Sequence, residues 1–337
     1  MLTEFTNKIL EKRLTKEMTS KAFEVIMSGR AQDKDIYIFL KALQENGVNK
    51  DHVIGAIDVM REKMIPVDIP LNSMDTCGTG GDGKFSLNIS TAVAFVLASY
   101  GIPVAKHGNR SITSNCGSAD VLKSLEIEID LIPEELTECI NKMGICFMFA
   151  PNHHPAMKYV ATARNELGKL RIKTIFNMLG PLLNPGNVDK QIVGVFSEEV
   201  QNIYKFVFNE SQKKAFIIHG HEGMDELSTE GVNVIAQKNE EDFLFDPIEL
   251  GMKRPIKNEL KGDNPDYNAS RILSVFSGEK DSFYDIIALN SAVGLILYKN
   301  LKLNLENINI YINEAKNLID NGYALNSINK LKGFSKK

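Results

Sequence analysis

The chain has 337 residues, of which 43% are hydrophobic and 24% charged, and a formal net charge of −4. This is the composition of a globular protein with two domains, or one large and one small domain. The mild negative charge argues against broad nucleic-acid binding, which usually needs a strongly basic face. No apolar stretch is long enough to cross a bilayer, so we expect neither nucleic acid nor membrane as a partner.

Residues 1–65 predict short helices that form a small helical domain. Apolar residues recur at helical spacing near the N-terminus, after a capping pair at Thr19-Ser20, after Asp33 and after Lys50. The first 15 residues are charged and amphipathic, without the apolar core of a signal peptide. The surplus apolar surface could form a subunit interface or pack on its own chain.

Residues 70–337 predict a large α/β domain. Short apolar runs predict strands over 102–105, 145–150, 191–196, 215–219 and 232–236. Helical patterns cover 92–100, 121–125, 134–143, 198–209, 284–301 and 308–321. Strands that alternate with helices indicate a mostly parallel central sheet flanked by helices. Ligands of such sheets bind beyond the carboxyl ends of the strands.

The cysteines do not indicate a zinc site. Cys77, Cys116, Cys139 and Cys146 show no C-x-x-C spacing. Reduced thiols in the cytoplasm fit this usage best, so we expect a cytoplasmic location.

The segment DTCGTGGDG, from Asp75 to Gly83, has four glycines and almost no bulk. We expect it to lie outside the core, because glycine lets a ligand approach the main chain closely. Successive N–H groups in such a segment can form an anion-binding nest. The next segment, NIST, begins an apolar helix, and a glycine loop before a helix N-terminus is typical of a phosphate site.

Two familiar nucleotide motifs are excluded. Gly78, Gly80 and Gly83 fit G-x-G-x-x-G, but residues 70–75 are not a hydrophobic strand. The strand at 102–105 ends in Lys106 instead of the acidic residue that contacts a ribose. A Walker A motif is excluded because Gly83-Lys84 is followed by Phe85 instead of a hydroxyl residue.

Two further polar segments follow predicted strands. The first, over 106–114, reads KHGNRSITS and is either a solvated loop or a segment that binds phosphate and carboxylate groups. The CGSAD segment that follows it caps the next predicted helix. An isolated pair such as Asp225-Glu226 is more often a solvated turn. Beside phosphate loops, however, it suits Mg²⁺, which takes few carboxylates and completes its shell with water and phosphate oxygens. His153 and His154 predict a polar pocket wall instead of a metal site, because adjacent residues do not share a helix face.

Together, GTGGDG, NIST, VAKHGNRSITSNCGSADVL, FAPNHHPAMK, TIFNMLGPLLNP and MDELS occur in the order seen in anthranilate phosphoribosyltransferases. The chain resembles this family over nearly its whole length. The resemblance implies a discontinuous helical domain, in which a segment at about 165–185 joins residues 1–65, and a homodimer formed through that domain. It implies a pentosyltransferase of tryptophan biosynthesis that transfers the phosphoribosyl group of phosphoribosyl pyrophosphate (PRPP) to the amine of anthranilate.

The resemblance also implies roles for individual residues. PRPP would be bound by Gly78, Gly81, Asp82, Ser86, Asn88, Ile89, Ser90, Thr91, Lys106, His107, Gly108, Asn109, Arg110, Ser111, Ile112, Thr113, Ser114 and Ser118. Anthranilate would meet Gly78, His107, Asn109, His154 and Arg164. Two Mg²⁺ ions per subunit would be bound by Ser90, Asp225 and Glu226. Lys106 would stabilise the leaving group electrostatically; His107 is a candidate general base, but none is assigned.

Two departures from the family pattern stand out. The family reads R-x-E-L-G-x-R-T-I-F-N, whereas this chain has about three extra residues between Arg164 and Thr174, which could displace Arg164. Ser86 replaces the usual threonine.

Two other readings of the motifs remain. A nucleoside phosphorylase, or a relative with another acceptor, shares the fold, but HGNR with GSAD argues against a phosphorylase. A nonenzymatic nucleic-acid-binding relative would show a basic face and an eroded GTGGD or DELS, which this chain does not.

Overall fold

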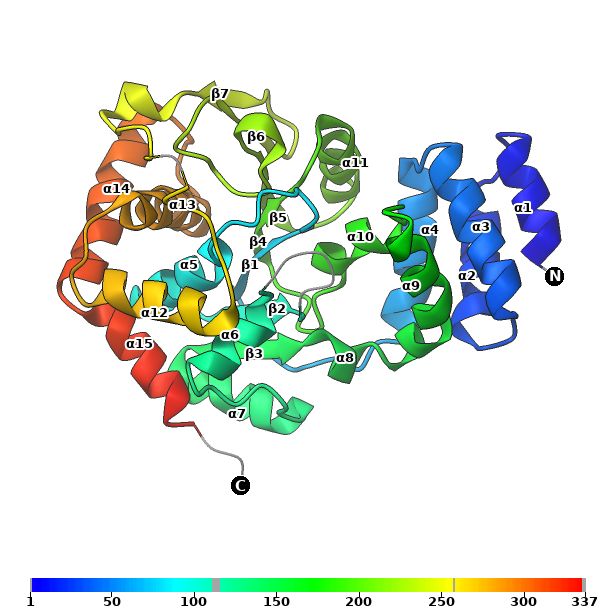
Figure 1. Cartoon of the computed structure of the whole chain (residues 1–337), viewed down its shortest axis with the longest axis horizontal. Helices are drawn as coiled ribbons and strands as arrows, with labels where there is room; N and C mark the ends of the chain where they lie inside the picture. The colour runs from blue at the N-terminus through cyan, green and yellow to red at the C-terminus, as the bar shows by residue number, and fades with distance from the viewer. Residues whose placement is uncertain (1, 111–115, 257, 335–337) are drawn as a thin grey trace. The chain divides into compact units, whose positions relative to one another are not determined.

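The computed structural model describes residues 2–110, 116–256 and 258–334 (Figure 1). It divides into two compact units. The first comprises Met1–Pro66 and Ala150–Pro185, and the second comprises Val67–Phe149 and Gly186–Lys337. The second stretch of the helical unit therefore begins at Ala150, earlier than the 165 expected from the sequence.

All the regular secondary structure in the described part of the first unit is helical. Its α-helices are α1 (Leu2–Leu10), α2 (Lys16–Met27), α3 (Asp33–Glu45), α4 (Lys50–Glu62), α8 (Ala150–His153), α9 (Ala161–Lys169) and α10 (Phe176–Leu179). Phe23 packs on Phe39 with ring centroids 6.5 Å apart and on Phe176 at 5.6 Å. Because Phe176 comes from the second stretch of chain, both stretches build one core.

The start of α2 differs from the sequence prediction. Thr15, instead of Thr19 or Ser20, caps the helix by accepting a hydrogen bond from the N–H of Met18 at 3.3 Å. Thr19 is fully buried inside the helix, where its hydroxyl donates to the carbonyl of Thr15 at 2.9 Å. When two hydroxyl residues lie one helical turn apart, sequence spacing alone does not decide which of them caps the helix.

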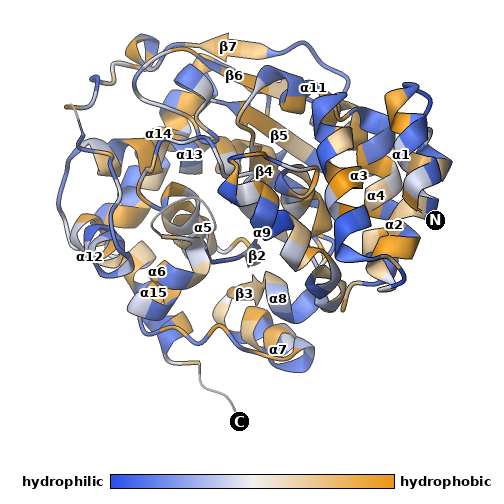
Figure 2. Ribbon diagram, turned by 45° about the vertical axis from the view of Figure 1, so that its right-hand side comes forward, coloured by the Kyte–Doolittle hydropathy of each residue, from blue (hydrophilic) through white to orange (hydrophobic). Residues whose placement is uncertain are grey.

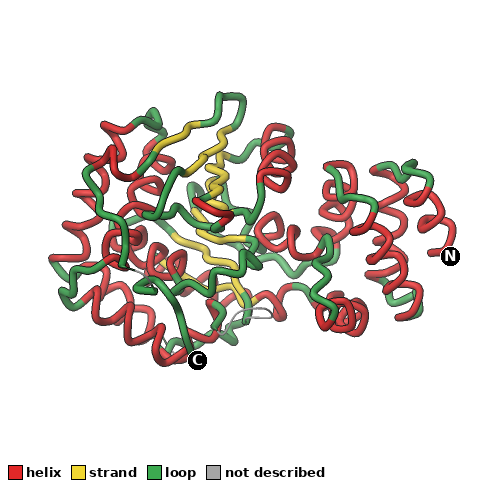
Figure 3. Tube along the Cα trace, turned by 45° about the horizontal axis from the view of Figure 1, so that its top comes forward, coloured by secondary structure: helices red, strands yellow, loops and turns green. Residues whose placement is uncertain are grey.

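The second unit contains a seven-stranded sheet in the order β3-β2-β1-β4-β5-β6-β7. Figure 3 shows its strands in yellow. Its strands are β1 (Met74–Gly78), β2 (Val104–Gly108), β3 (Ile145–Phe149), β4 (Lys190–Gly194), β5 (Lys214–His219), β6 (Asn233–Gln237) and β7 (Phe243–Phe245). Strands β1 to β5 are parallel, while β6 and β7 pair antiparallel. The predicted α/β fold with a mostly parallel sheet is confirmed.

Strand β1 corrects one sequence prediction. The segment around Asp75 was expected to be a loop outside the core, yet its first half lies between β2 and β4 in the sheet. Asp75 and Thr76 are 0% and 1% exposed. The Asp75 carboxylate accepts a hydrogen bond from the His107 N–H at 3.2 Å and one from the Gln191 amide at 3.4 Å. A buried strand can carry polar side chains when neighbouring segments satisfy their hydrogen bonds, and a hydropathy pattern does not show these partners.

The helices of the second unit pack on its sheet and on one another. They are α5 (Ile89–Ser99), α6 (Ser118–Ser124), α7 (Pro133–Met143), α11 (Glu198–Asn209), α12 (Pro265–Phe276), α13 (Ser282–Lys299), α14 (Leu305–Asp320) and α15 (Tyr323–Lys332). Helix α13 packs on α5 and α14 and is buried along most of its length. Figure 2 shows mainly hydrophobic colouring on β4 and β5. In the described part of the chain, no helix combines the length and the hydrophobicity needed to cross a membrane.

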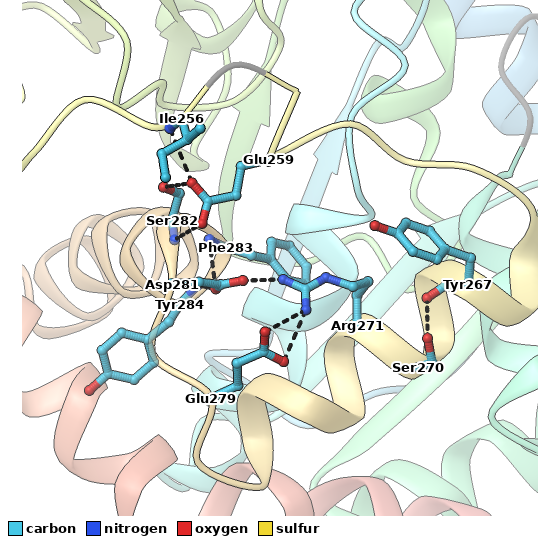
Figure 4. A network of polar contacts seen from close by, with 10 residues as sticks. All are labelled: Ile256, Glu259, Tyr267, Ser270, Arg271, Glu279, Asp281, Ser282, Phe283 and Tyr284. Carbon is cyan, nitrogen blue, oxygen red and sulfur yellow. Dashed lines mark hydrogen bonds and ion pairs between the residues drawn. The ribbon is translucent and has the colours of Figure 1, made fainter.

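A polar network joins helices α12 and α13 (Figure 4). Arg271 on α12 donates to the Glu279 carboxylate at 2.9 and 3.0 Å and to the Asp281 carboxylate. Asp281 in turn caps α13 by accepting from the N–H groups of Phe283 and Tyr284, both at 3.0 Å. The network therefore orients the start of the buried helix α13 against α12.

Candidate active site

The candidate residues of the second unit lie at the carboxyl ends of β1, β2 and β5. These strands are parallel, so their carboxyl ends share one edge of the sheet. The glycine segment follows β1, Lys106 to Gly108 end β2, and the Asp225-Glu226 loop follows β5. Segments far apart in the sequence are thereby brought together.

Asp225 lies directly against the glycine segment. Its Oδ2 accepts a hydrogen bond from the Gly80 N–H at 2.7 Å. A Cβ atom at Gly78 would lie 2.3 Å from the same oxygen, and one at Gly194 would lie 1.5 Å from the Asp225 carbonyl oxygen. Neither position has room for a side chain, so both glycines are needed for Asp225 to sit where it does.

Glu226 contacts the first turn of α5. Its Oε1 accepts a hydrogen bond from the Ser90 N–H at 3.0 Å, where a carboxylate also interacts favourably with the helix dipole. Lys106, only 4% exposed, donates to the Ser90 hydroxyl at 3.3 Å and to the Thr76 carbonyl. One lysine therefore joins β1, β2 and the start of α5.

The carboxylate pair is electrostatically unfavourable by itself. Burial raises the pKa of both the Asp225 and the Glu226 carboxyl groups, and a nearby carboxylate raises the pKa of each further: Asp82 acts on Asp225, and Asp225 on Glu226. Lys106 opposes the upward shift in the Glu226 pKa. A bound dication would relieve this repulsion.

The donor set fits magnesium. Asp225, Glu226 and the Ser90 hydroxyl offer hard oxygen ligands, which Mg²⁺ prefers. Among the residues that the structure describes, no three His, Cys, Asp or Glu side chains form a cluster that could hold a metal ion. A pair of carboxylates suits Mg²⁺, because its remaining ligands come from water and substrate phosphates.

The loop after β2 packs on the start of α6. The carbonyl of Asn109 accepts from the Ser118 hydroxyl at 3.3 Å and from the Ala119 N–H at 3.2 Å. A Cβ atom at Gly108 would lie 2.2 Å from the Ser118 oxygen. Arg110 forms an ion pair of 3.6 Å with Asp120. The predicted residues Ser111, Ile112, Thr113 and Ser114 lie outside the described part of the chain.

The residues that follow the glycine segment contact parts of the chain that no motif in the sequence marks. Lys84 forms an ion pair of 2.7 Å with Glu222, just before the carboxylate pair. The Asn88 side-chain oxygen accepts from the amide of Asn268 on α12 at 2.8 Å, and Asn268 is 1% exposed. Nothing in the local sequence marks Asn268, whereas Gly194 could have been noticed as a glycine inside a strand.

Arg164 and His154 belong to the helical unit. The three extra residues form the turn that ends α9. There the N–H groups of Leu170 and Ile172 both donate to the carbonyl of Leu167 at 3.0 Å. The Arg164 guanidinium lies 5.3 Å from the ring centre of Phe176. The extra residues therefore do not separate Arg164 from the TIFN segment.

The sequence matches known proteins over most of its length. Residues 71–325 match the family described as "Glycosyl transferase family, a/b domain". The anthranilate phosphoribosyltransferase of Pelagibacter ubique is 40% identical over 332 residues, covering 97% of this chain and 98% of the relative. That of Petrotoga mobilis is 39% identical and covers 99% of this chain and 97% of the relative.

Solved structures agree. The anthranilate phosphoribosyltransferase from Thermus thermophilus is 32% identical, with a TM-score of 0.90 and 98% of both chains covered. The Saccharomyces cerevisiae enzyme in complex with PRPP and Mg is 28% identical, with a TM-score of 0.91 over 99% of this chain and 97% of that one. The chain belongs to this glycosyltransferase family and, within it, to the anthranilate phosphoribosyltransferases.

Proposed function

We propose that the enzyme transfers the phosphoribosyl group of PRPP to the amine of anthranilate and releases pyrophosphate, a step of tryptophan biosynthesis. One structural observation carries the proposal. A half-buried carboxylate pair, Asp225-Glu226, lies against both a glycine segment and a helix N-terminus, in a chain that matches anthranilate phosphoribosyltransferases over nearly its full length. A pyrophosphate carried by a dication needs this combination of groups.

PRPP is assigned to the carboxyl edge of the sheet. The described residues assigned to it come from the segment after β1, the start of α5, the end of β2 and the start of α6. They are Gly78, Gly81, Asp82, Ser86, Asn88, Ile89, Ser90, Thr91, Lys106, His107, Gly108, Asn109, Arg110 and Ser118. The support for this assignment is a chain of contacts. Gly80 and Ser90 contact the carboxylate pair, Lys106 contacts Ser90, and Ser118 contacts Asn109.

Magnesium is assigned to Ser90, Asp225 and Glu226, with two ions per subunit. When bound, the metal neutralises negative charge that develops on the departing pyrophosphate. The two half-buried carboxylates would hold it, and its charge would offset the repulsion between them. Lys106 adds a positive charge fixed by Thr76 and Ser90, so it needs little reorganisation during the reaction.

Anthranilate is assigned to Gly78, His107, Asn109, His154 and Arg164. Its amine is a neutral nucleophile, so placement contributes more than activation, and orientation supplies roughly 7–11 kcal/mol in the best cases. His107 is buried and its main chain is held by Asp75. We assign no general base.

The quaternary structure and location belong to the same proposal. We expect a homodimer formed through the helical unit and a cytoplasmic enzyme. Exposed apolar side chains on α1 and α3 support the dimer, and four cysteines that form no disulfide support a reducing compartment.

The test is to measure turnover in variants of the two carboxylates. Turnover is monitored by the change in fluorescence as anthranilate is consumed in the presence of PRPP and magnesium. Asp225→Asn and Glu226→Gln should each lower kcat by about 100-fold or more, because the charge on the leaving group is no longer balanced. The KM for anthranilate should change by less than about threefold, since these groups are not assigned to the acceptor.

A matched control is Glu222→Gln, an exposed carboxylate on the same loop that is not assigned to the metal. Near-normal kcat in both Asp225→Asn and Glu226→Gln at saturating magnesium would show that the metal assignment is wrong. No fluorescence change with the wild-type enzyme would point to a different acceptor.

A further inference from the structure

Asn290 lies in the middle of the buried helix α13 and is 1% exposed. Its side-chain oxygen accepts a hydrogen bond from the Leu227 N–H at 2.9 Å. Its side-chain nitrogen donates to the Leu227 carbonyl at 3.0 Å and to the Ile286 carbonyl at 2.9 Å. One side chain therefore holds both main-chain groups of the residue that follows Glu226.

The chemistry of these partners allows only one orientation of the amide. A main-chain N–H can only donate and a carbonyl can only accept, so the amide oxygen must face the first and the nitrogen the second. Leu227 is 0% exposed, so neither of its main-chain groups can turn to water instead. The two peptide bonds that flank Leu227 are thus held in one orientation relative to α13.

This peptide bears directly on the carboxylate pair. The N–H held by Asn290 belongs to the peptide bond that joins Glu226 to Leu227. On its other side, Glu226 reaches the Ser90 N–H on α5, and α5 itself packs on α13. The carboxylate pair is therefore anchored to α13 through its main chain and to α5 through the Glu226 side chain.

We propose that Asn290 is a positioning residue for the reaction, which holds Asp225 and Glu226 in register for the magnesium–PRPP complex. This inference rests on the proposed function. Asn290 lies about 60 positions from the carboxylate pair in sequence. On this proposal it supports metal binding by fixing the main chain beside the two carboxylates. Because Asn290 acts through Leu227, its loss should change the use of magnesium and PRPP more than the use of anthranilate.

The test variant is Asn290→Asp, which keeps the shape and the acceptor but loses the amide donors. The matched control is Ser291→Ala, the next residue, which is 0% exposed and whose hydroxyl has no hydrogen-bond partner among the described residues. In Asn290→Asp, the magnesium concentration for half-maximal rate should rise about tenfold or more. Calorimetry without anthranilate should show a similar loss of affinity for PRPP with magnesium, and the KM for anthranilate should stay within about threefold. Ser291→Ala should stay within about twofold of wild type throughout.

Hydrogen exchange in the metal-free wild-type protein provides a readout that does not depend on folding of a variant. The Leu227 amide should exchange as slowly as amides of β4, and in Asn290→Asp it should exchange about tenfold faster or more. Fast exchange of Leu227 in the wild type, or unchanged magnesium dependence in a folded Asn290→Asp, would overturn the proposal. If Asp225→Asn and Glu226→Gln lose turnover while Asn290→Asp keeps the wild-type magnesium dependence, only the inference about Asn290 fails. If both carboxylate variants keep near-normal turnover at saturating magnesium, the metal assignment itself fails.

Discussion

Gly194 leaves the space that the main chain of Asp225 occupies. A Cβ atom there would lie 1.5 Å from the Asp225 carbonyl oxygen, and one at Gly220 would lie 2.1 Å from the Glu226 carbonyl oxygen. Both carboxylates are therefore placed by contacts between main chains, which a change of side chain at these glycines would break. The carboxylates were predictable from their loop, whereas only the structure shows that Gly194 and Gly220 make room for their main chain.

His154 makes the helical unit sensitive to acid. It is 7% exposed, and burial lowers the pKa of its imidazole from 6.5 to about 4, with His153 adding to the shift. The unfolded chain binds a proton near pH 6.5 and the folded chain only near pH 4, so stability is present above pH 6.5 and is lost as the pH falls. Between pH 7 and pH 5 we expect a loss of about 2 kcal/mol in the free energy of unfolding.

Urea denaturation of the wild type and of His154→Gln at pH 7 and pH 5 measures this difference. The variant should lose less stability between the two pH values, because glutamine does not titrate. Equal losses in both proteins would show that His154 does not cause the acid sensitivity.

The network between α12 and α13 predicts an effect on stability. Arg271 and Asp281 are 15% and 14% exposed, so removing the arginine leaves a largely buried carboxylate without its cation. Arg271→Met should lower the free energy of unfolding by about 2–3 kcal/mol. Lys142→Ala, which removes an exposed ion pair within α7, should change it by less than about 0.5 kcal/mol. Chemical denaturation measures both, and equal effects would mean that the network adds no more than a surface pair.

Helices and apolar strands were predictable because their patterns are local. Helix α11 begins at Glu198 and ends at Asn209, as its apolar spacing predicts, and the apolar strand β5 lies within one residue of its predicted range. Strand β1 was not predicted, because its polar side chains find their hydrogen-bond partners on other segments: Asp75 on β2 and β4, and Thr76 at the start of α5. The cap of α2 was misplaced because both Thr15 and Thr19 fit the local pattern.

The proposed dimer makes a prediction for the whole molecule. Leu10 on α1 and Ile38 on α3 are 61% and 43% exposed, and these two helices pack together within the helical unit. Light scattering should give about twice the 37.6 kDa of one chain. The double variant Leu10→Glu, Ile38→Glu should shift the protein toward the monomer, because charge opposes burial of this surface.

Leu71→Glu is the matched control, since Leu71 is 86% exposed but belongs to the α/β unit. It should leave the mass unchanged. A monomer in the wild type, or an unchanged dimer in the double variant, would contradict a dimer formed through this surface.

The sequence alone determined the α/β class, the family and the segments that carry the polar chemistry, because these depend on local composition and on motifs in a fixed order. Only the tertiary structure decided that Asp75 is buried in the sheet and that Arg164 lies beside Phe176 despite three extra residues. It also decided that Asn268 on α12 contacts Asn88 and that Asn290 on α13 contacts Leu227. Each of these depends on hydrogen bonds or packing between segments far apart in sequence, and such contacts leave no periodic signal in the residues that make them.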